Sequence, residues 1–140
     1  MVEISGKTMG TTYHIKIVSD VIDSGTLKTA IDKRLVQLNQ VFSTYIPDSE
    51  LSLLNRGDGD IPISKELMKV LSLSSEIHHL SGGAFDPTVG PLVNLWGFGP
   101  SGPGNGIPSD EEIDQAMART GFTRLLLEGS TISKPQDLVI

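Results

Sequence analysis

The sequence predicts a domain of mixed helix and strand structure, because both strand and helix patterns occur along the chain. Residues 11–18 alternate apolar and polar side chains with the period of two that marks a half-buried strand. Longer stretches repeat apolar residues at three- and four-residue steps, as one face of a helix does. Near the carboxyl end, residues 124–127 and 131–133 have the composition of a hairpin. A chain of 140 residues is long enough for one domain with a core.

The first predicted helix covers residues 24–42, whose apolar side chains fall on one face. A turn at residues 45–48 follows, and then a short amphipathic stretch with Ser49 as its natural N-cap. Residues 55–60, with the sequence NRGDGD, are predicted to form a loop.

A second long helix is predicted to begin at Ser64 and to end at the glycines that follow Ser81. A third helix is predicted within residues 108–120, where Ser109 and Glu112 have the spacing of a capping box. The chain then closes on the sequence DLVI with no turn signal. This ending predicts a chain cut within a buried strand, and therefore part of a longer protein.

Charge and composition exclude several classes of protein. The formal net charge is −6 and the Lys and Arg residues are scattered, whereas a nucleic-acid surface needs clustered cations. We therefore expect no nucleic-acid partner. No apolar run approaches the ~18 residues that span a bilayer, and the amino-terminal MVEISGKTMG lacks the basic and apolar regions of a signal peptide. The absence of Cys excludes disulfides, thiol catalysis and Cys-zinc sites.

The most unusual stretch covers residues 81–102, SGGAFDPTVGPLVNLWGFGPSG. Asp86 and Pro87 have the sequence of a helix N-cap and first helical position, which predicts a capped helix from Pro87 to about Trp96. A second interpretation stays open beside it, because glycines let a backbone approach a ligand closely. The Leu, Trp and Phe side chains of this stretch are expected to anchor it to the core, and residues 97–108 are predicted to be a mobile loop.

Other candidate chemistry finds little support in the sequence. His78 and His79 are neighbours on a predicted helix and point in different directions, while His14 lies on the polar face of a predicted strand. No HExxH zinc motif and no Gly-x-Ser-x-Gly elbow occurs. Asp58 and Asp60 lie in a glycine-rich loop, but the Glu that a calcium loop requires is missing.

Three motifs occur in the order and spacing of one family. They are KTMGTTY, FSTYIPDSELSLLN and SGGAFDPTVGPLVNLWGFGP, and the segment IPSDEEIDQAMARTGF extends the likeness. Through them the chain resembles the FAD:protein FMN transferases, the ApbE-type family once described as thiamine-biosynthesis lipoproteins. The likeness covers nearly the whole chain and about the first half of a family member. It implies that residues 1–140 are the amino-terminal part of one larger domain of the α+β class, with helices packed on a mainly antiparallel sheet.

The resemblance implies an enzyme that transfers FMN from FAD to a Thr or Ser hydroxyl of a target protein, with Mg²⁺ as cofactor and AMP as leaving group. The implied targets are flavin-accepting subunits of membrane redox complexes, such as the sodium-pumping quinone reductase and the Rnf complex. The 140 residues alone are expected to be inactive. Two alternatives stay open: an FAD pyrophosphatase that gives FMN and AMP, and a non-catalytic flavin-binding module.

Five residues are carried over from the family as flavin-site contacts: Met9, Tyr45, Ala84, Phe85 and Asp86. Asn55 and Trp96 also lie in matching motifs and are assigned to the scaffold. The sequence identifies no catalytic residue, since the hydroxyl nucleophile belongs to the target protein.

The family's metal ligands, Asp and Thr residues, are expected beyond the point that matches Ile140, so no metal ligand is assigned within the chain. Family members are typically periplasmic lipoproteins anchored to the inner membrane. The sequence has no Cys to carry a lipid. The periplasmic location is therefore implied by the resemblance alone.

Overall fold

A computed structural model describes residues 1–19, 21, 23–100, 102, 104 and 106–140. The chain combines helices with two antiparallel sheets, which confirms the predicted α+β class. In chain order the elements are β1 (Val2–Thr8), β2 (Thr11–Ile17), α1 (Ser24–Phe42), α2 (Glu50–Arg56), β3 (Gly59–Pro62), α3 (Lys65–Leu80), α4 (Gly90–Leu95), α5 (Asp110–Met117), the 3₁₀ turn η1 (Phe122–Arg124), β4 (Leu126–Glu128) and β5 (Thr131–Lys134).

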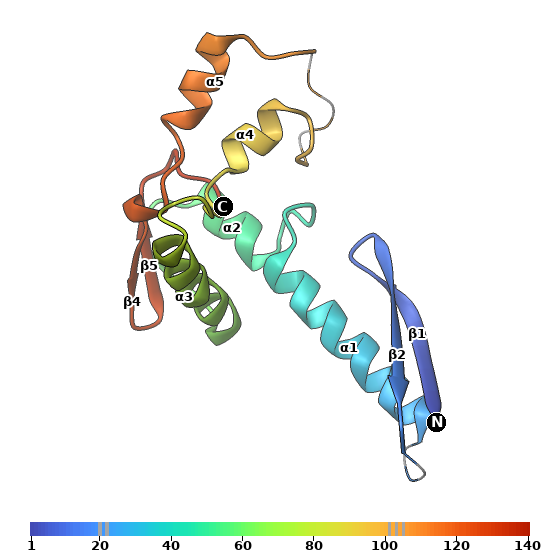
Figure 1. The fold of residues 1–140 in the computed structure, drawn as a ribbon. Helices are drawn as coiled ribbons and strands as arrows, with labels where there is room; N and C mark the ends of the chain where they lie inside the picture. Colours follow the sequence, from blue (N-terminus) through green and yellow to red (C-terminus); the bar gives the residue numbers. More distant parts are fainter. Residues whose placement is uncertain (20, 22, 101, 103, 105) are drawn as a thin grey trace.

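The strands form two separate antiparallel sheets in the described part of the chain. β1 and β2 make a hairpin, and β5 lies between β3 and β4 in a three-stranded sheet. Figure 1 shows the hairpin beside α1 at one end of the molecule and the three-stranded sheet next to α3 at the other. The long helix α1 therefore connects two packing units.

The hydrophobic core lies between α2, α3 and the three-stranded sheet. Leu54, Leu67 and Leu71 pack there against Ile132 of β5 and Leu138 of the carboxyl-terminal segment, and all of them are almost completely buried. By contrast, none of the described residues of α1 is fully buried, although the helix has an apolar face. This core fixes α2 and the residues after β5 next to each other.

Helix limits follow the capping signals closely. α1 covers the predicted residues, although its N-cap is Asp23. The Asp23 carboxylate accepts hydrogen bonds from the backbone amides of Gly25 and Thr26. Ser49 caps α2 and Ser64 caps α3, as predicted. The predicted capping box at the start of α5 is confirmed in both directions.

The glycine-rich stretch departs from its prediction. α4 begins at Gly90 and Val89 is its N-cap, so the prediction that Asp86 caps a helix starting at Pro87 is wrong. The physical reason is that the Asp86 carboxylate is already bonded to Thr88 and to a distant backbone amide. The expected aromatic anchors are also wrong, because Trp96 is 45 % exposed and Phe98 is 77 % exposed.

Smaller corrections concern the strands. β1 was not predicted, since Gly6 and the polar residues around it weaken the alternating pattern. The predicted loop at residues 55–60 is shorter than expected, because α2 continues to Arg56 and β3 begins at Gly59. Residues 138–140 form no strand, although Leu138 is fully buried. The hairpin predicted near the carboxyl end is confirmed as β4 and β5.

Two further predictions concern regions that the structure describes only in part. The predicted mobile loop at 97–108 includes residues 101, 103 and 105, which lie outside the described residues. Among the described helices, none is both long and apolar enough to cross a bilayer.

Candidate functional site

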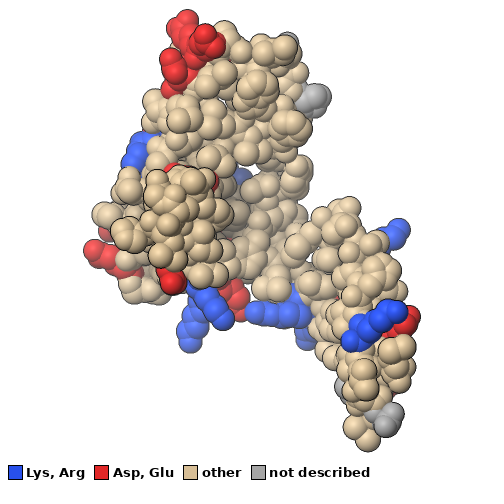
Figure 2. Space-filling view, viewed as in Figure 1, with Lys and Arg blue, Asp and Glu red and all other residues tan. Residues whose placement is uncertain are grey.

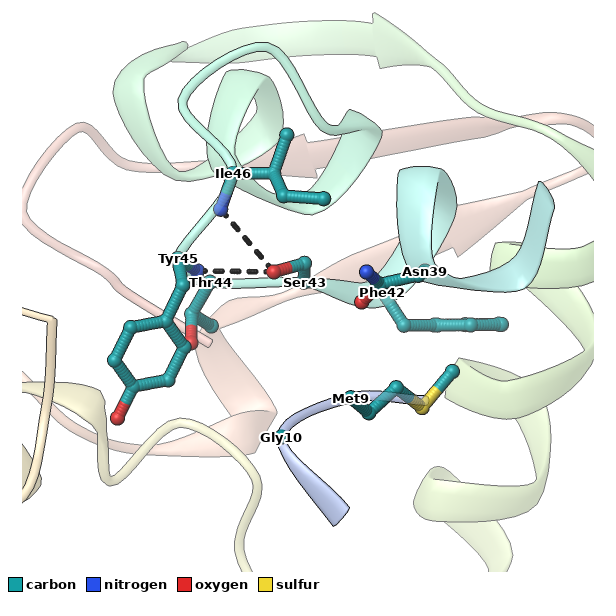
Figure 3. Close-up of a pocket in the computed structure, with 8 residues that line it drawn as sticks. All are labelled: Met9, Gly10, Asn39, Phe42, Ser43, Thr44, Tyr45 and Ile46. Carbon is teal, nitrogen blue, oxygen red and sulfur yellow. Dashed lines mark hydrogen bonds between the residues drawn. The ribbon is translucent and has the colours of Figure 1, made fainter. Parts of the chain in front are cut away.

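A cavity of about 650 Å³ lies between the tip of the β1–β2 hairpin and the carboxyl end of α1. Figure 3 shows the hairpin tip facing the turn that follows α1. The residues that line the cavity are Met9, Gly10, Asn39, Phe42, Ser43, Thr44, Tyr45 and Ile46. Two segments far apart in the sequence therefore build one cavity.

The hairpin turn fixes how Met9 reaches this cavity. Thr8 pairs with Thr11, so Met9 and Gly10 form a two-residue turn. Their φ angles are 48° and 74°, the left-handed conformation that a tight hairpin turn requires at both positions. A side chain at such a position costs about 1–2 kcal/mol, and glycine avoids the cost. Met9 is therefore held in an unfavourable backbone conformation at the cavity wall.

A network of serine hydroxyls shapes the turn that carries Tyr45. The Ser43 hydroxyl accepts hydrogen bonds from the backbone amides of Tyr45 and Ile46, both at 3.1 Å. The Ser43 carbonyl in turn accepts from the hydroxyls of Ser49 and Ser52. Because Ser49 is the N-cap of α2, the start of that helix and the Tyr45 turn are fixed together.

A second cavity of about 440 Å³ adjoins the first, since Thr44 and Tyr45 line both. Tyr45 is 69 % exposed, and its hydroxyl lies 3.3 Å from the Phe98 carbonyl oxygen, to which it donates. The other residues that line this cavity are Ser52, Asn55, Arg56, Pro87, Val89, Gly90, Val93, Asn94, Phe98, Gly99, Pro100, Val139 and Ile140.

The carboxyl-terminal segment is one wall of the second cavity, and Asn55 holds it there. The Asn55 amide nitrogen donates to the Ile140 carbonyl at 2.8 Å, and its oxygen accepts from the Ile140 amide at 2.9 Å. Lys134 donates to the Leu138 carbonyl at 3.0 Å. A side chain at Gly90 would collide with Val139, so the close approach requires glycine. Asn55 therefore positions the wall, whereas Trp96 does not line either cavity.

The structure brings together two of the five residues that the resemblance assigns to the flavin site. Met9 and Tyr45 line the first cavity. Ala84, Phe85 and Asp86 line neither cavity, although Pro87 directly after them lines the second. The Asp86 carboxylate points into the protein, toward Thr88 and the Phe122 amide.

The surroundings of Asp86 stabilise its charged form. Burial alone would raise the pKa of this carboxyl group, but hydrogen bonds from Thr88 and from the Phe122 amide, with the nearby His78, lower the pKa below its ordinary value. The His78 Nδ1 atom lies 3.9 Å from the carboxylate and 2.8 Å from the Phe85 carbonyl oxygen. Asp86 therefore remains an acceptor for these donors at neutral pH.

The acidic side chains of the described residues form no metal-binding cluster. In residues 1–19, 21, 23–100, 102, 104 and 106–140, no group of three or more His, Cys, Asp or Glu side chains is arranged to hold a metal ion. Figure 2 shows Asp and Glu residues spread over several separate places on the visible face rather than gathered in one.

Several cavity residues were not predicted. Asn39 and Phe42 lie on the last turns of α1, where their spacing also fits an ordinary packing face. Ser43 offered a stronger signal, because a Ser directly after a helix and before a turn is well placed to bond the next amides. Residues on different elements meet here through packing, which sequence spacing does not reveal.

Comparison with known proteins defines the class first: solved structures from Vibrio cholerae and Pseudomonas stutzeri that share this fold are named flavin transferase and flavinyl transferase. The sequence model of the ApbE family matches residues 9–139. A solved structure of the flavin transferase ApbE from Vibrio cholerae superimposes with a TM-score of 0.92 at 44 % identity, covering 99 % of this chain and 47 % of that one. The chain belongs to the ApbE family.

Curated relatives are named FAD:protein FMN transferase. The FAD:protein FMN transferase of Vibrio cholerae serotype O1 is 45 % identical over 137 residues, which are 95 % of this chain and 41 % of the relative. The FAD:protein FMN transferase of Haemophilus influenzae is 38 % identical over 144 residues, covering 96 % and 42 %. The chain thus spans less than half the length of these relatives.

Proposed function

We propose that this chain contributes the flavin-contacting part of an FAD:protein FMN transferase. The observation that carries the proposal is that Met9 and Tyr45, from separate motifs, line one cavity with a second cavity beside it. A cavity of several hundred cubic ångströms with apolar and aromatic walls is suited to a flat organic ring. The names of the curated relatives supply the reaction class.

In the proposed reaction, a Thr or Ser hydroxyl of a target protein attacks the phosphorus atom of the FMN half of FAD. A new phosphoester bond forms, the bond to the AMP phosphate breaks, and the hydroxyl proton leaves with the departing group or the solvent. A bound Mg²⁺ ion would neutralise phosphate charge. The residues of this chain bind and orient the flavin and exclude water from it, which is catalysis by positioning.

We further propose that residues 1–140 are the amino-terminal part of one larger flavin-transferase domain. The chain covers less than half of its curated relatives. In addition, α3 carries an exposed apolar stripe beside its buried face, at steps of three and four residues. Its members and their exposed fractions are Val70 45 %, Leu73 55 %, Ile77 39 % and Leu80 76 %. A continuous exposed stripe of this kind is typical of a surface that another part of a fold covers.

The test uses a hybrid protein in which residues 1–140 replace the aligned segment of the Vibrio cholerae relative. The hybrid is incubated with FAD, Mg²⁺ and a target subunit that carries an acceptor Thr. We expect covalent flavin on the target and release of AMP. A target with Ala in place of the acceptor Thr is the control, and it should stay unlabelled.

The same assay separates the alternatives. Free FMN and AMP without labelled target would indicate an FAD pyrophosphatase, in which water replaces the hydroxyl. FAD that binds and stays intact would indicate a non-catalytic flavin-binding module. Absence of any flavin binding by the hybrid would contradict the proposal in all three forms.

Partners and location are proposals of the same kind. The family resemblance supports targets among flavin-accepting subunits of membrane redox complexes, of the sodium-pumping quinone reductase or Rnf type. It also supports a periplasmic, lipid-anchored location. Fractionation of cells that produce the natural protein would test this location, and recovery only from the cytoplasm would contradict it.

A further inference from the structure

Asp86 and Thr88 form a clamp between the glycine-rich stretch and the segment that follows α5. One Asp86 oxygen accepts from the Thr88 amide at 2.8 Å and from the Thr88 hydroxyl at 2.6 Å. The other accepts from the Phe122 amide at 3.0 Å. The Thr88 hydroxyl oxygen accepts from the Gly121 amide at 2.8 Å. Two adjacent backbone amides are therefore bound by side chains more than thirty residues away.

The clamp is buried. Thr88 is completely inaccessible to solvent, and the Asp86 side chain is only 16 % exposed. Both carboxylate oxygens already have donors within the protein, so little hydrogen-bonding capacity remains for a ligand. A buried charge with this many partners has a fixed position.

The backbone next to the clamp is held from a second side. The Ser81 hydroxyl accepts from the Phe85 amide at 3.0 Å, and the His78 Nδ1 atom lies 2.8 Å from the Phe85 carbonyl oxygen. The His78 ring also packs on Phe122, with ring centroids 5.4 Å apart. α3, the glycine-rich stretch and η1 thus meet at Phe85 and Asp86.

Beyond the clamp, the same stretch continues into the second cavity. Pro87, Val89 and Gly90 line that cavity, whereas Asp86 does not. Any movement of Thr88 relative to Gly121 would therefore move a cavity wall directly. Pro87 lies between the two clamp residues in the sequence, and Val89 directly follows Thr88.

We propose that Asp86 and Thr88 are positioning residues, which set the wall formed by Pro87, Val89 and Gly90 through their hydrogen bonds to the segment after α5. This inference rests on the proposed function, because it assigns the clamp a role in flavin binding. It differs from the assignment of Asp86 as a direct flavin contact, since the carboxylate acts through backbone amides.

The decisive variant is Thr88→Val in the hybrid protein, because Val keeps the shape and removes the hydroxyl. The Gly121 amide then loses its acceptor, and the FAD dissociation constant should rise by about fivefold or more. Thr88→Ser keeps the hydroxyl and should bind FAD within about twofold of the parent. Thr29→Val, at an exposed hydroxyl on α1, is the matched control and should leave FAD affinity unchanged.

Affinity is measured by flavin fluorescence at a temperature where circular dichroism finds each variant folded. The visible circular dichroism of bound flavin is recorded as well, because a displaced wall changes it and a uniform loss of stability does not. If Thr88→Val does not fold, Thr88→Cys keeps a weak acceptor and should show an intermediate loss of affinity.

Parent-like affinity and spectrum in Thr88→Val, together with weakened binding in Asp86→Asn, would overturn the inference and identify Asp86 as a direct ligand contact. Equal losses of FAD affinity in Thr88→Val, in Asp86→Asn and in the double variant would support it, because the effects of two residues that act as one unit do not add. Failure of the unmodified hybrid to bind any flavin would instead overturn the proposed function.

Discussion

At the scale of single residues, Met9 links backbone strain to the proposed flavin site. It is the one non-glycine residue with positive φ in the described part of the chain, and it lines the first cavity. Strain of this kind persists where the surrounding structure holds the residue in place, and it motivates a hypothesis of function. Gly10 beside it satisfies the same turn without a side chain.

Met9→Gly is therefore expected to stabilise the protein and weaken flavin binding. Relief of the left-handed conformation should raise the free energy of unfolding by about 1 kcal/mol. Loss of the thioether contact should raise the FAD dissociation constant several-fold. Urea unfolding and flavin titration measure the two effects. A variant that gained stability and kept full affinity would remove Met9 from the proposed site.

Asp86 predicts a pH dependence of stability at acidic pH. Its pKa is lowered in the folded protein, so the unfolded chain takes up the proton first as the pH falls. The stabilisation by Asp86 is fully present above the unfolded pKa of about 3.9, and it is lost as the pH falls through the folded value. Unfolding curves of the parent and of Asp86→Asn should therefore differ at pH 7 and converge at lower pH. A difference between the two curves that does not shrink as the pH falls below about 3.9 would contradict this.

At the scale of elements, the hairpin is joined to α1 through Tyr13. The Tyr13 hydroxyl donates to Asp32 at 2.5 Å, and Lys28 donates to the other oxygen of the same carboxylate. Gly6 lies opposite Tyr13 in the hairpin, and a Cβ atom there would be 2.6 Å from the ring. The absence of a side chain at Gly6 thus allows the ring to reach α1.

Gly6→Ala should displace the Tyr13 ring and break its hydrogen bond to Asp32. That hydrogen bond, with burial and the Asp32 charge, raises the pKa of Tyr13, so the pKa should fall toward its ordinary value in the variant. Ultraviolet titration of the phenol measures this in a Tyr45→Phe background, where Tyr13 is the single tyrosine. An unchanged titration curve would indicate that the ring stays in place.

Ser49 has a second role beyond capping α2, because its hydroxyl also donates a hydrogen bond to the Ser43 carbonyl. Ser49→Ala should lower the free energy of unfolding by about 1–2 kcal/mol and loosen the Tyr45 turn. The matched control is Ser64→Ala, which removes the cap of α3 and leaves the Tyr45 turn intact. We expect both variants to lose stability and only Ser49→Ala to lose flavin affinity. Equal affinity in the two would contradict the coupling.

At the scale of the whole molecule, the exposed stripe on α3 predicts that its substitution changes the stability of the chain and of the hybrid by different amounts. The double variant Leu73→Ser, Leu80→Ser should change the stability of the 140-residue chain by no more than about 0.5 kcal/mol, since both side chains are already exposed. In the hybrid, where we expect the stripe to be covered, the loss should be about 2 kcal/mol or more.

The control for the stripe is Leu71→Ser, which lies on the buried face of α3 and should destabilise both proteins. Chemical unfolding measures all of these differences. Equal effects of the double variant in the chain and the hybrid would indicate that the stripe stays exposed in the larger protein.

The sequence alone determined the parts of the fold that depend on local physics. Side chains at N-caps and apolar periodicity act within a few residues, so α1, α2, α3 and α5 begin close to the residues that their capping signals predicted. The family resemblance rested on the separate motifs KTMGTTY, FSTYIPDSELSLLN and SGGAFDPTVGPLVNLWGFGP. β1 was missed because Gly6 weakens the strand pattern of the sequence. The structure explains this glycine, because the Tyr13 ring of β2 packs against it and leaves no room for a side chain.

Only the tertiary structure decided what Asp86 does and which residues share a cavity. Asp86-Pro87 has the local sequence of a helix start. In the folded chain, however, the Asp86 carboxylate accepts hydrogen bonds from the Thr88 hydroxyl and the Phe122 amide, and it caps no helix. Likewise, the pairing of Met9 with Tyr45 depends on how the hairpin packs along α1. Local sequence encodes which partners a side chain is able to bond; the packed chain decides which of them come within reach.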